Sequence, residues 1–198
     1  MNKTNEISQT ATCYECGGPM EGKKGEHHYT ECGLTSVYLR DVMIYRCTKC
    51  SAVEPEIPAA GILHRVIALR IAKKKNLLTG GEVRFLRKFC GYSAAEFAEI
   101  LGSSTSVVSR WEKNGCGKET DRFIRMLFLT NMIREIVGQQ TPLLKNVTVT
   151  QLVGEIDNTL KLIEGREKTQ DRLDISPEDI SQLAGMPEEV GELVSNIQ

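Results

Sequence analysis

Residues 93–115 read SAAEFAEILGSSTSVVSRWEKNG, the most informative segment of the sequence. Ser93 followed three residues later by Glu96 is a capping-box signature that opens a helix, and Gly102 ends that helix. A short serine-rich turn then leads into a second helix over Ser104–Lys113. The stretch therefore predicts two short helices joined by a tight turn.

Two helices with this spacing are typical of a helix-turn-helix, whose second helix lies in the major groove of DNA. Val107 and Val108 are expected to face inward, and the polar side of the second helix is left to meet bases. Arg110 on that side is able to form a bidentate pair with guanine, whereas Ser and Thr read bases less selectively. The predicted DNA-binding residues are Ser93, Thr105, Ser106, Ser109, Arg110 and Lys113, together with Arg84 and Arg87 on the preceding helix. The alternative is an ordinary bundle of three helices in which Arg110 is merely exposed.

Three further helices are predicted around this pair. An apolar stripe at helical spacing begins near Ala59 and runs into Lys73-Lys74-Lys75. Thr79 followed by Glu82 is a second capping box. A long helix over 119–137 is expected to pack through Phe123, Met126, Leu127, Ile133 and Val137, which leaves Phe128 and Leu129 exposed as a candidate homodimer interface.

Charge is distributed unevenly along the chain. The formal net charge is only −1. Residues 61–137, however, contain fourteen basic and seven acidic side chains, while residues 138–198 contain five and eleven. A basic middle next to an acidic end indicates that the middle segment meets a polyanion, unless it is simply a solvated basic face.

Four of the seven cysteines form two CxxC pairs, Cys13–Cys16 and Cys47–Cys50, separated by thirty residues. Two such turns are able to aim four thiolates at one Zn²⁺ ion, which would then have no open coordination position and a structural role. An iron–sulfur cluster is the alternative ligand for the same four residues. The remaining cysteines are predicted to be non-ligands: Cys32 is structural or at the surface, Cys90 packs in the core and Cys116 is exposed.

Alternating apolar residues at Val37, Leu39, Met43 and Tyr45 predict a small antiparallel sheet between the CxxC pairs. The fold class is therefore α+β: a small N-terminal zinc-binding β domain, followed by an all-α helix-turn-helix domain with a helical C-terminal extension. The predicted boundaries are a disordered N-terminus over 1–12, the zinc domain over 13–58, a helical linker over 59–78, the helix-turn-helix domain over 79–137 and an acidic, partly helical extension over 138–198.

Within the extension we expect one helix that begins at Thr148 and another with Ser176 as its N-cap and Pro177 at its first position. A weakly ordered, solvated tail is the alternative for this region. No stretch of the chain is apolar enough to span a membrane. The first dozen residues contain no apolar secretory segment, so we expect a cytoplasmic protein.

The paired cysteines together with VRFLRKFCGYSAAEFAEILGSSTSVVSRWEKNG resemble the MqsA-type antitoxins of bacteria, which join a YgiT-type zinc finger to an Xre/Cro-like helix-turn-helix. The resemblance covers residues 13–137. It implies zinc ligation by Cys13, Cys16, Cys47 and Cys50, and base reading by Arg110. The family's base-reading Asn falls on Ser106, and a Gln common after the first cap falls on Ala94, so the operator is expected to differ.

The resemblance also implies a homodimer that binds a palindromic operator on double-stranded DNA, represses its own operon and engages a ribonuclease-type toxin.

Three other functions remain open from the residues. One is a stand-alone regulator with no toxin partner, and another is a zinc-ribbon module that binds only protein. An enzyme is the third, but the chain contains no Ser/His/Asp set, phosphate loop or HExxH motif, so no catalytic residues are predicted.

Overall fold

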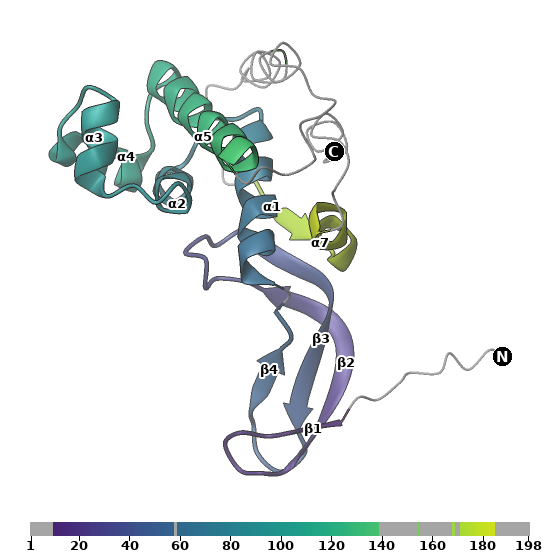
Figure 1. The fold of residues 1–198 in the computed structure, drawn as a ribbon. Coiled ribbons are helices and arrows are strands. Elements are labelled where there is room, and N and C mark those ends of the chain that lie inside the picture. Colours follow the sequence, from purple (N-terminus) through teal and green to yellow (C-terminus); the bar gives the residue numbers. More distant parts are fainter. Residues whose placement is uncertain (1–9, 58, 139–153, 155–167, 169–170, 185–198) are drawn as a thin grey trace.

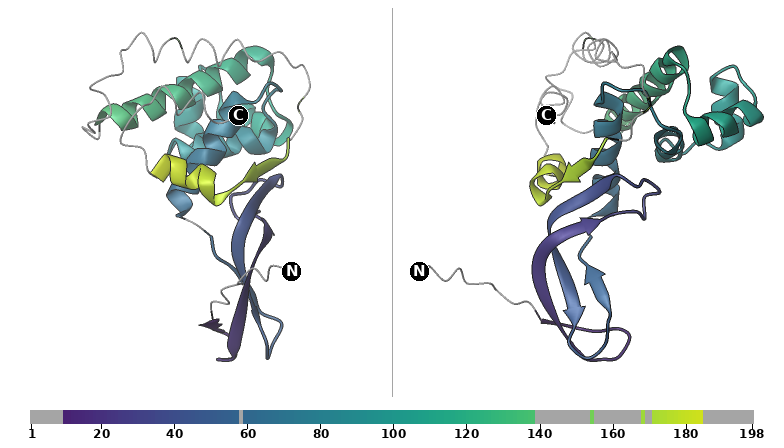
Figure 2. Two further views of the ribbon diagram at one scale, coloured as in Figure 1. Left: turned by 90° about the vertical axis from the view of Figure 1, so that its right-hand side faces the viewer. Right: turned by 180° about the vertical axis from the view of Figure 1, so that it is seen from behind.

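The computed structural model describes residues 10–57, 59–138, 154, 168 and 171–184. A sheet projects at one end and a group of helices lies at the other, with helix α1 (Ala60–Lys73) between them (Figure 1). Two further views show the same elongated arrangement (Figure 2). The mixture of sheet and helices confirms the α+β class.

The sheet is antiparallel through its first four strands, and its two longest strands lie between the CxxC pairs, where a small antiparallel sheet was predicted. These strands are β1 (Thr10–Thr12), β2 (Pro19–His28), β3 (Val37–Cys47) and β4 (Val53–Pro55), in that spatial order. The long β2–β3 hairpin pairs Met20 with Cys47 and His28 with Tyr38. The prediction that residues 10–12 are disordered is wrong, because their backbone pairs with β2 from Thr10 opposite Glu21.

The helices begin and end close to the predicted positions. Beyond α1 they are α2 (Gly80–Phe89), α3 (Ala94–Ile100), α4 (Thr105–Asn114) and α5 (Lys118–Gly138). Both predicted capping boxes form: Thr79 with Glu82 opens α2, and Ser93 with Glu96 opens α3. Gly102 follows α3 with a φ of +59°, a conformation that favours glycine.

One hydrophobic core joins the sheet to the helices. Helix α1 buries Leu63, Val66, Ile67 and Ile71 in it, and β3 contributes Val37 and Leu39. The segment predicted as a linker is therefore central to the core. A second, smaller apolar cluster consists of Cys13, Met20 and Ala52 and lies at the cysteine end of the sheet.

The described part of the C-terminal extension folds against the sheet and α1. Strand β5 (Leu173–Ile175), which the sequence analysis did not predict, pairs in parallel with the first residues of β3. Helix α7 (Pro177–Ala184) follows with the predicted cap: the backbone N–H of Asp179 donates to Ser176 Oγ at 3.3 Å. The helix predicted to begin at Thr148 falls outside the described residues, apart from Gly154.

Two burial predictions were wrong. Cys116 is buried against α5 rather than exposed. On α5 the inward face is set by Asp121, Ile124, Arg125, Phe128 and Met132, so Phe128 and Leu129 are buried while Phe123 is 57% exposed and Met126 39%. The buried Asp121–Arg125 ion pair turns the helix this way, because Arg125 also donates to backbone oxygens at the end of α1.

Candidate metal centre and nucleic-acid interface

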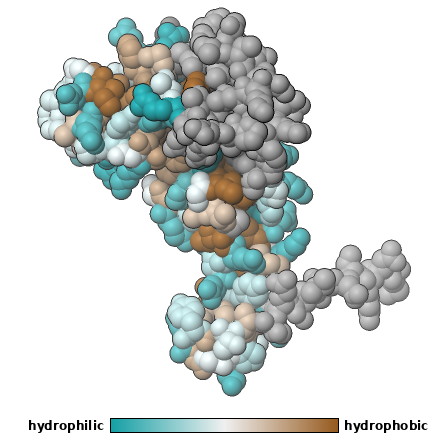
Figure 3. All heavy atoms as spheres, in the orientation of Figure 1, coloured by the Kyte–Doolittle hydropathy of each residue, from teal (hydrophilic) through white to brown (hydrophobic). Residues whose placement is uncertain are grey.

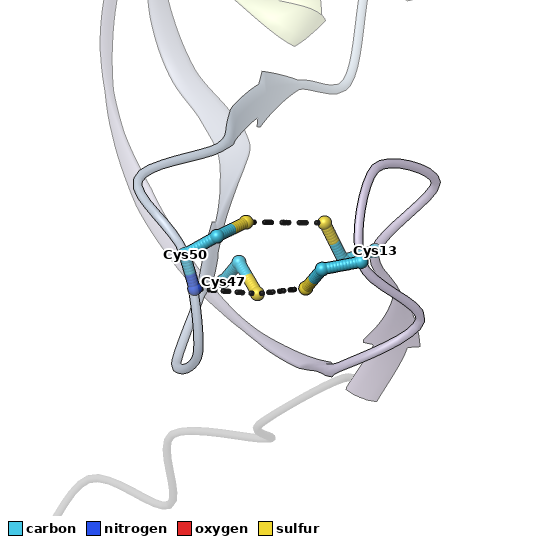
Figure 4. Close-up of side chains that lie close together, drawn as sticks. Cys13, Cys47 and Cys50 are labelled. Atoms are coloured by element: carbon cyan, nitrogen blue, oxygen red, sulfur yellow. Dashed lines mark hydrogen bonds between the residues drawn. The ribbon is translucent and has the colours of Figure 1, made fainter.

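Four cysteine sulfurs face one point between two loops at the far end of the sheet (Figure 4). Cys13 and Cys16 come from the loop after β1, while Cys47 ends β3 and Cys50 lies in the next turn. The four sulfurs all lie within 4.8 Å of one another. Sγ of Cys13 is 3.6 Å from Sγ of Cys50, and Sγ of Cys16 is 3.5 Å from Sγ of Cys47.

The local backbone explains how each loop aims its sulfurs. In the first loop, the N–H of Gly17 donates to the carbonyl of Cys13 at 2.9 Å, and the φ of Gly17 is +67°. That turn brings Cys16 back toward Cys13 and favours glycine at the next position. In the second loop, the backbone N–H groups of Lys49 and Cys50 both donate to Cys47 Sγ, at 3.3 and 3.4 Å.

This donor set fits a tetrahedral metal ion. Thiolates about 2.3 Å from a central zinc ion lie roughly 3.8 Å apart, close to the spacing of the two nearest sulfur pairs. All four cysteines are free thiols rather than disulfides. The backbone N–H of Lys49 lowers the pKa of Cys47 to about 6, which favours its thiolate form, whereas hydrogen bonds with neighbouring thiols raise the pKa of Cys16 and of Cys50.

This cluster does not include Cys32, Cys90, His27 or His28. Cys32 Sγ donates to the carbonyl of Tyr29, and Cys90 packs beside the hydrophobic core. His28 Nε2 contacts the carbonyl of Thr35 at 2.8 Å, while His27 lies 3.4 Å from Glu31. Among the residues described here, the four cysteines are the only group arranged to hold a metal.

Helix α4 presents a polar face to solvent. Val108 is fully buried, and Val107 and Trp111 are half-buried on the opposite side. The predicted DNA-binding residues of this helix are all exposed: Thr105, Ser106, Ser109, Arg110 and Lys113. Ser93, also exposed, accepts the backbone N–H of Glu96 through its hydroxyl, so it acts as the cap of α3.

The two arginines predicted on α2 have different surroundings. Both guanidinium groups donate to the carboxylate of Glu112 on α4, Arg84 at 3.0 Å and Arg87 at 2.5 Å. The side chain of Arg87 is only 11% exposed and also donates to the carbonyl of Tyr92, whereas that of Arg84 is 58% exposed. Arg87 therefore serves packing between α2 and α4, and Arg84 retains a solvent-facing surface.

Glu112 is a positioning residue that the sequence analysis missed. Its side chain is almost fully buried, and burial opposes its ionisation. Hydrogen bonds from Arg87 and Arg84 outweigh that effect and hold the pKa of Glu112 below its ordinary value. The signal in the sequence was the acidic residue within the Arg-Trp-Glu-Lys run. A carboxylate on a helix that is predicted to pack is expected to form an ion pair, because a buried charge without a partner is costly.

Comparison with known proteins gives no relative for this chain. No family model, no curated protein and no solved structure matches it.

Proposed function

We propose that this protein is a sequence-specific DNA-binding transcriptional regulator, most simply an autorepressor, with a structural zinc site. The observation that carries the proposal is the exposed polar face of α4, with Arg110 among hydroxyl side chains and Lys113 at its end. Helices α3 and α4, joined by a tight turn at Gly102, match the helix-turn-helix layout. In this reading α4 is the recognition helix.

The charges near α4 suit the DNA backbone. Arg110 is placed to read a guanine edge, while Lys113 and the exposed Arg84 neutralise phosphates. Arg87 does not contact phosphates in this proposal, because its guanidinium group is buried against the carboxylate of Glu112. The excess of basic residues over 61–137 supplies the wider attraction to a polyanion.

The four cysteines are proposed to hold Zn²⁺ as a structural ion. A closed set of four thiolates leaves no coordination position for a substrate, so the site stabilises the sheet rather than catalysing a reaction. The apolar cluster beside it is small, and an ion there would replace the missing core. We accordingly propose a non-enzymatic protein.

A homodimer is part of the proposal, because one helix-turn-helix contacts too few bases for useful specificity. Phe123 and Met126 on α5 replace the buried Phe128 and Leu129 as interface residues, and Ile100 on α3 is exposed as well. On the face seen in Figure 3, hydrophobic residues gather over α3 and over the end of α5 that follows α4.

We propose further, from the resemblance to MqsA-type proteins, that this regulator is an antitoxin that binds a toxin.

A second candidate function, a module that binds only protein, is favoured by the cysteine end of the sheet. There Tyr14 is 74% exposed and Val53 47% exposed, although each is apolar enough to bury. The two functions differ in what Arg110 does, since a protein-binding module does not need it.

The test is binding to duplex DNA from the promoter region of the protein's own gene. We expect the Arg110→Ala variant to lose about 1–3 kcal/mol of binding free energy and to discriminate less at one base pair of each half-site. Arg46→Ala is the matched control, because it removes an exposed arginine from the sheet. Equal affinities of wild type and Arg110→Ala would favour the protein-binding module.

A further inference from the structure

Lys168 is a residue of the acidic extension that lies directly against the end of α4. Its ammonium Nζ donates to the carbonyl oxygen of Asn114, the last residue of α4, at 3.0 Å. Its aliphatic stem covers Gly115, whose φ is +72°: a Cβ built there would be only 2.8 Å from Lys168 Cδ. The end of α4 and Lys168 are thus held together by a hydrogen bond and by close packing.

The position also suits a cation electrostatically. The C-terminal end of a helix carries a partial negative charge, which attracts an ammonium group. An ammonium has three donors, and the Asn114 carbonyl uses one of them. Lys168 is exposed to solvent, as are Lys113 before this loop and Lys118 after it. Lys113 and Lys118 thus flank the short connection between α4 and α5 in the sequence, and Lys168 contacts it.

The chain just after Lys168 is anchored to the sheet. The backbone N–H of Leu173 donates to the carbonyl of Ser36 at 2.8 Å, and β5 then pairs with β3. Arg172 bonds to Glu26 at 2.6 Å, and its guanidinium lies over the ring of Tyr38. Strand β5, fixed on the sheet in this way, begins only five residues after Lys168 in the sequence.

We infer that Lys168 is a phosphate-contacting residue of the DNA interface, supplied by the C-terminal extension. The inference rests on the proposed function, because it takes α4 as the helix that enters the major groove. With that helix in the groove, we expect a lysine beside its end to come near the sugar–phosphate backbone, where it would act as a point charge with no base preference. The acidic extension thereby adds to the affinity for DNA through one cation.

The experiment compares salt-dependent binding of wild type and Lys168→Met. Methionine keeps an apolar stem over Gly115 and removes the charge. The probes are the promoter duplex and a duplex of equal length and random sequence. We expect affinity for both to fall about fivefold at about 0.15 M salt, and the slope of log affinity against log salt to decrease by about one, as for the loss of one phosphate contact. Lys168→Arg should remain within about twofold of wild type.

Lys24→Met is the matched control, since it removes an exposed lysine from β2 and should leave both slopes unchanged. Thermal melting checks that each variant folds, and Lys168→Gln is the second neutral variant should the methionine protein be unfolded. A Lys168→Met protein that melts earlier but keeps the wild-type salt slope would show a helix-capping role only and would overturn the inference. Wild-type protein that binds neither duplex would overturn the proposed function as well.

Discussion

At the scale of single residues, Gly80 marks the closest approach between two helices. A Cβ at Gly80 would meet the carbonyl oxygen of Glu112 at 2.5 Å, so the backbone of α2 or α4 would have to move. We predict that Gly80→Ala lowers the free energy of unfolding by about 1–3 kcal/mol, as overpacking does in cores. Gly81→Ala is the control, because its Cβ would lie 3.6 Å from Leu34. Urea denaturation that shows equal stability for both variants would contradict this packing.

A second prediction concerns His64, whose Nε2 lies 2.9 Å from the hydroxyl of Tyr29. Burial lowers the pKa of His64 below its ordinary 6.5, so the folded protein binds this proton less tightly than the unfolded chain. The contribution of neutral His64 to the free energy of unfolding is therefore fully present above about pH 6.5. It is lost as the pH falls from 6.5 toward the lowered pKa of the folded protein. Unfolding free energies measured between about pH 5 and 8 should fall more steeply on the acid side for wild type than for His64→Gln. Parallel curves would disprove it.

Residue-level predictions succeeded where local chemistry decides the outcome. Thr79 and Ser93 were identifiable because each needs only a carboxylate three residues later. The burial of Cys116 and Phe128 was not identifiable, because it depends on the Asp121–Arg125 pair finding carbonyl oxygens on a distant helix. Long-range partners of this kind have no local signature.

At the scale of elements, the two ends of the sheet are stabilised differently: one packs in the large core, and the other carries the proposed metal site. Val37 and Leu39 at one end of β3 share the large core with α1, whereas the cysteine end has only the small cluster around Met20. We predict that removing the metal with a chelator unfolds the cysteine end alone. Amide hydrogen exchange should accelerate over residues 10–22 and 44–55, while the fluorescence of Trp111, the single tryptophan, stays unchanged.

Cys47→Ser gives the same comparison without a chelator, and it should reduce the bound metal and loosen the same segments. Protection that is retained at the cysteine end of the metal-free protein would show that the ion contributes nothing to folding. Loss of the Trp111 signal together with the sheet would show instead that the two ends unfold as one unit.

Most of the elements were predictable because each carries its own start and stop signals. The exceptions are β1, β4 and β5, which have three residues each and form only by pairing with a longer strand. A three-residue strand has too few alternating positions to be recognised. For β5 the partner lies more than 130 residues earlier in the chain, so nothing near Leu173 indicates it.

At the scale of the whole molecule, the described part of the extension bridges the start of β3 and helix α1. Arg40 and Arg172 both bond to Asp174, and Arg70 on α1 bonds to Asp179 at 2.5 Å. Burial of Ile175 and Ile180 completes the contact. We predict that Ile175→Ala costs about 2–4 kcal/mol of stability, whereas the exposed Glu178→Ala costs well under 1 kcal/mol. Similar thermal stabilities of the two variants would mean that the extension is not part of the core.

The proposed regulator requires that α4 enters the major groove of a specific operator. Methylation interference on the promoter duplex tests it most directly, because the N7 atom of guanine lies in that groove. We predict interference at two half-sites about 34 Å apart, with the signal at one guanine per half-site absent from the complex of Arg110→Ala. Interference that is identical for wild type and Arg110→Ala, or absent from the major groove, would show that α4 does not read bases through Arg110.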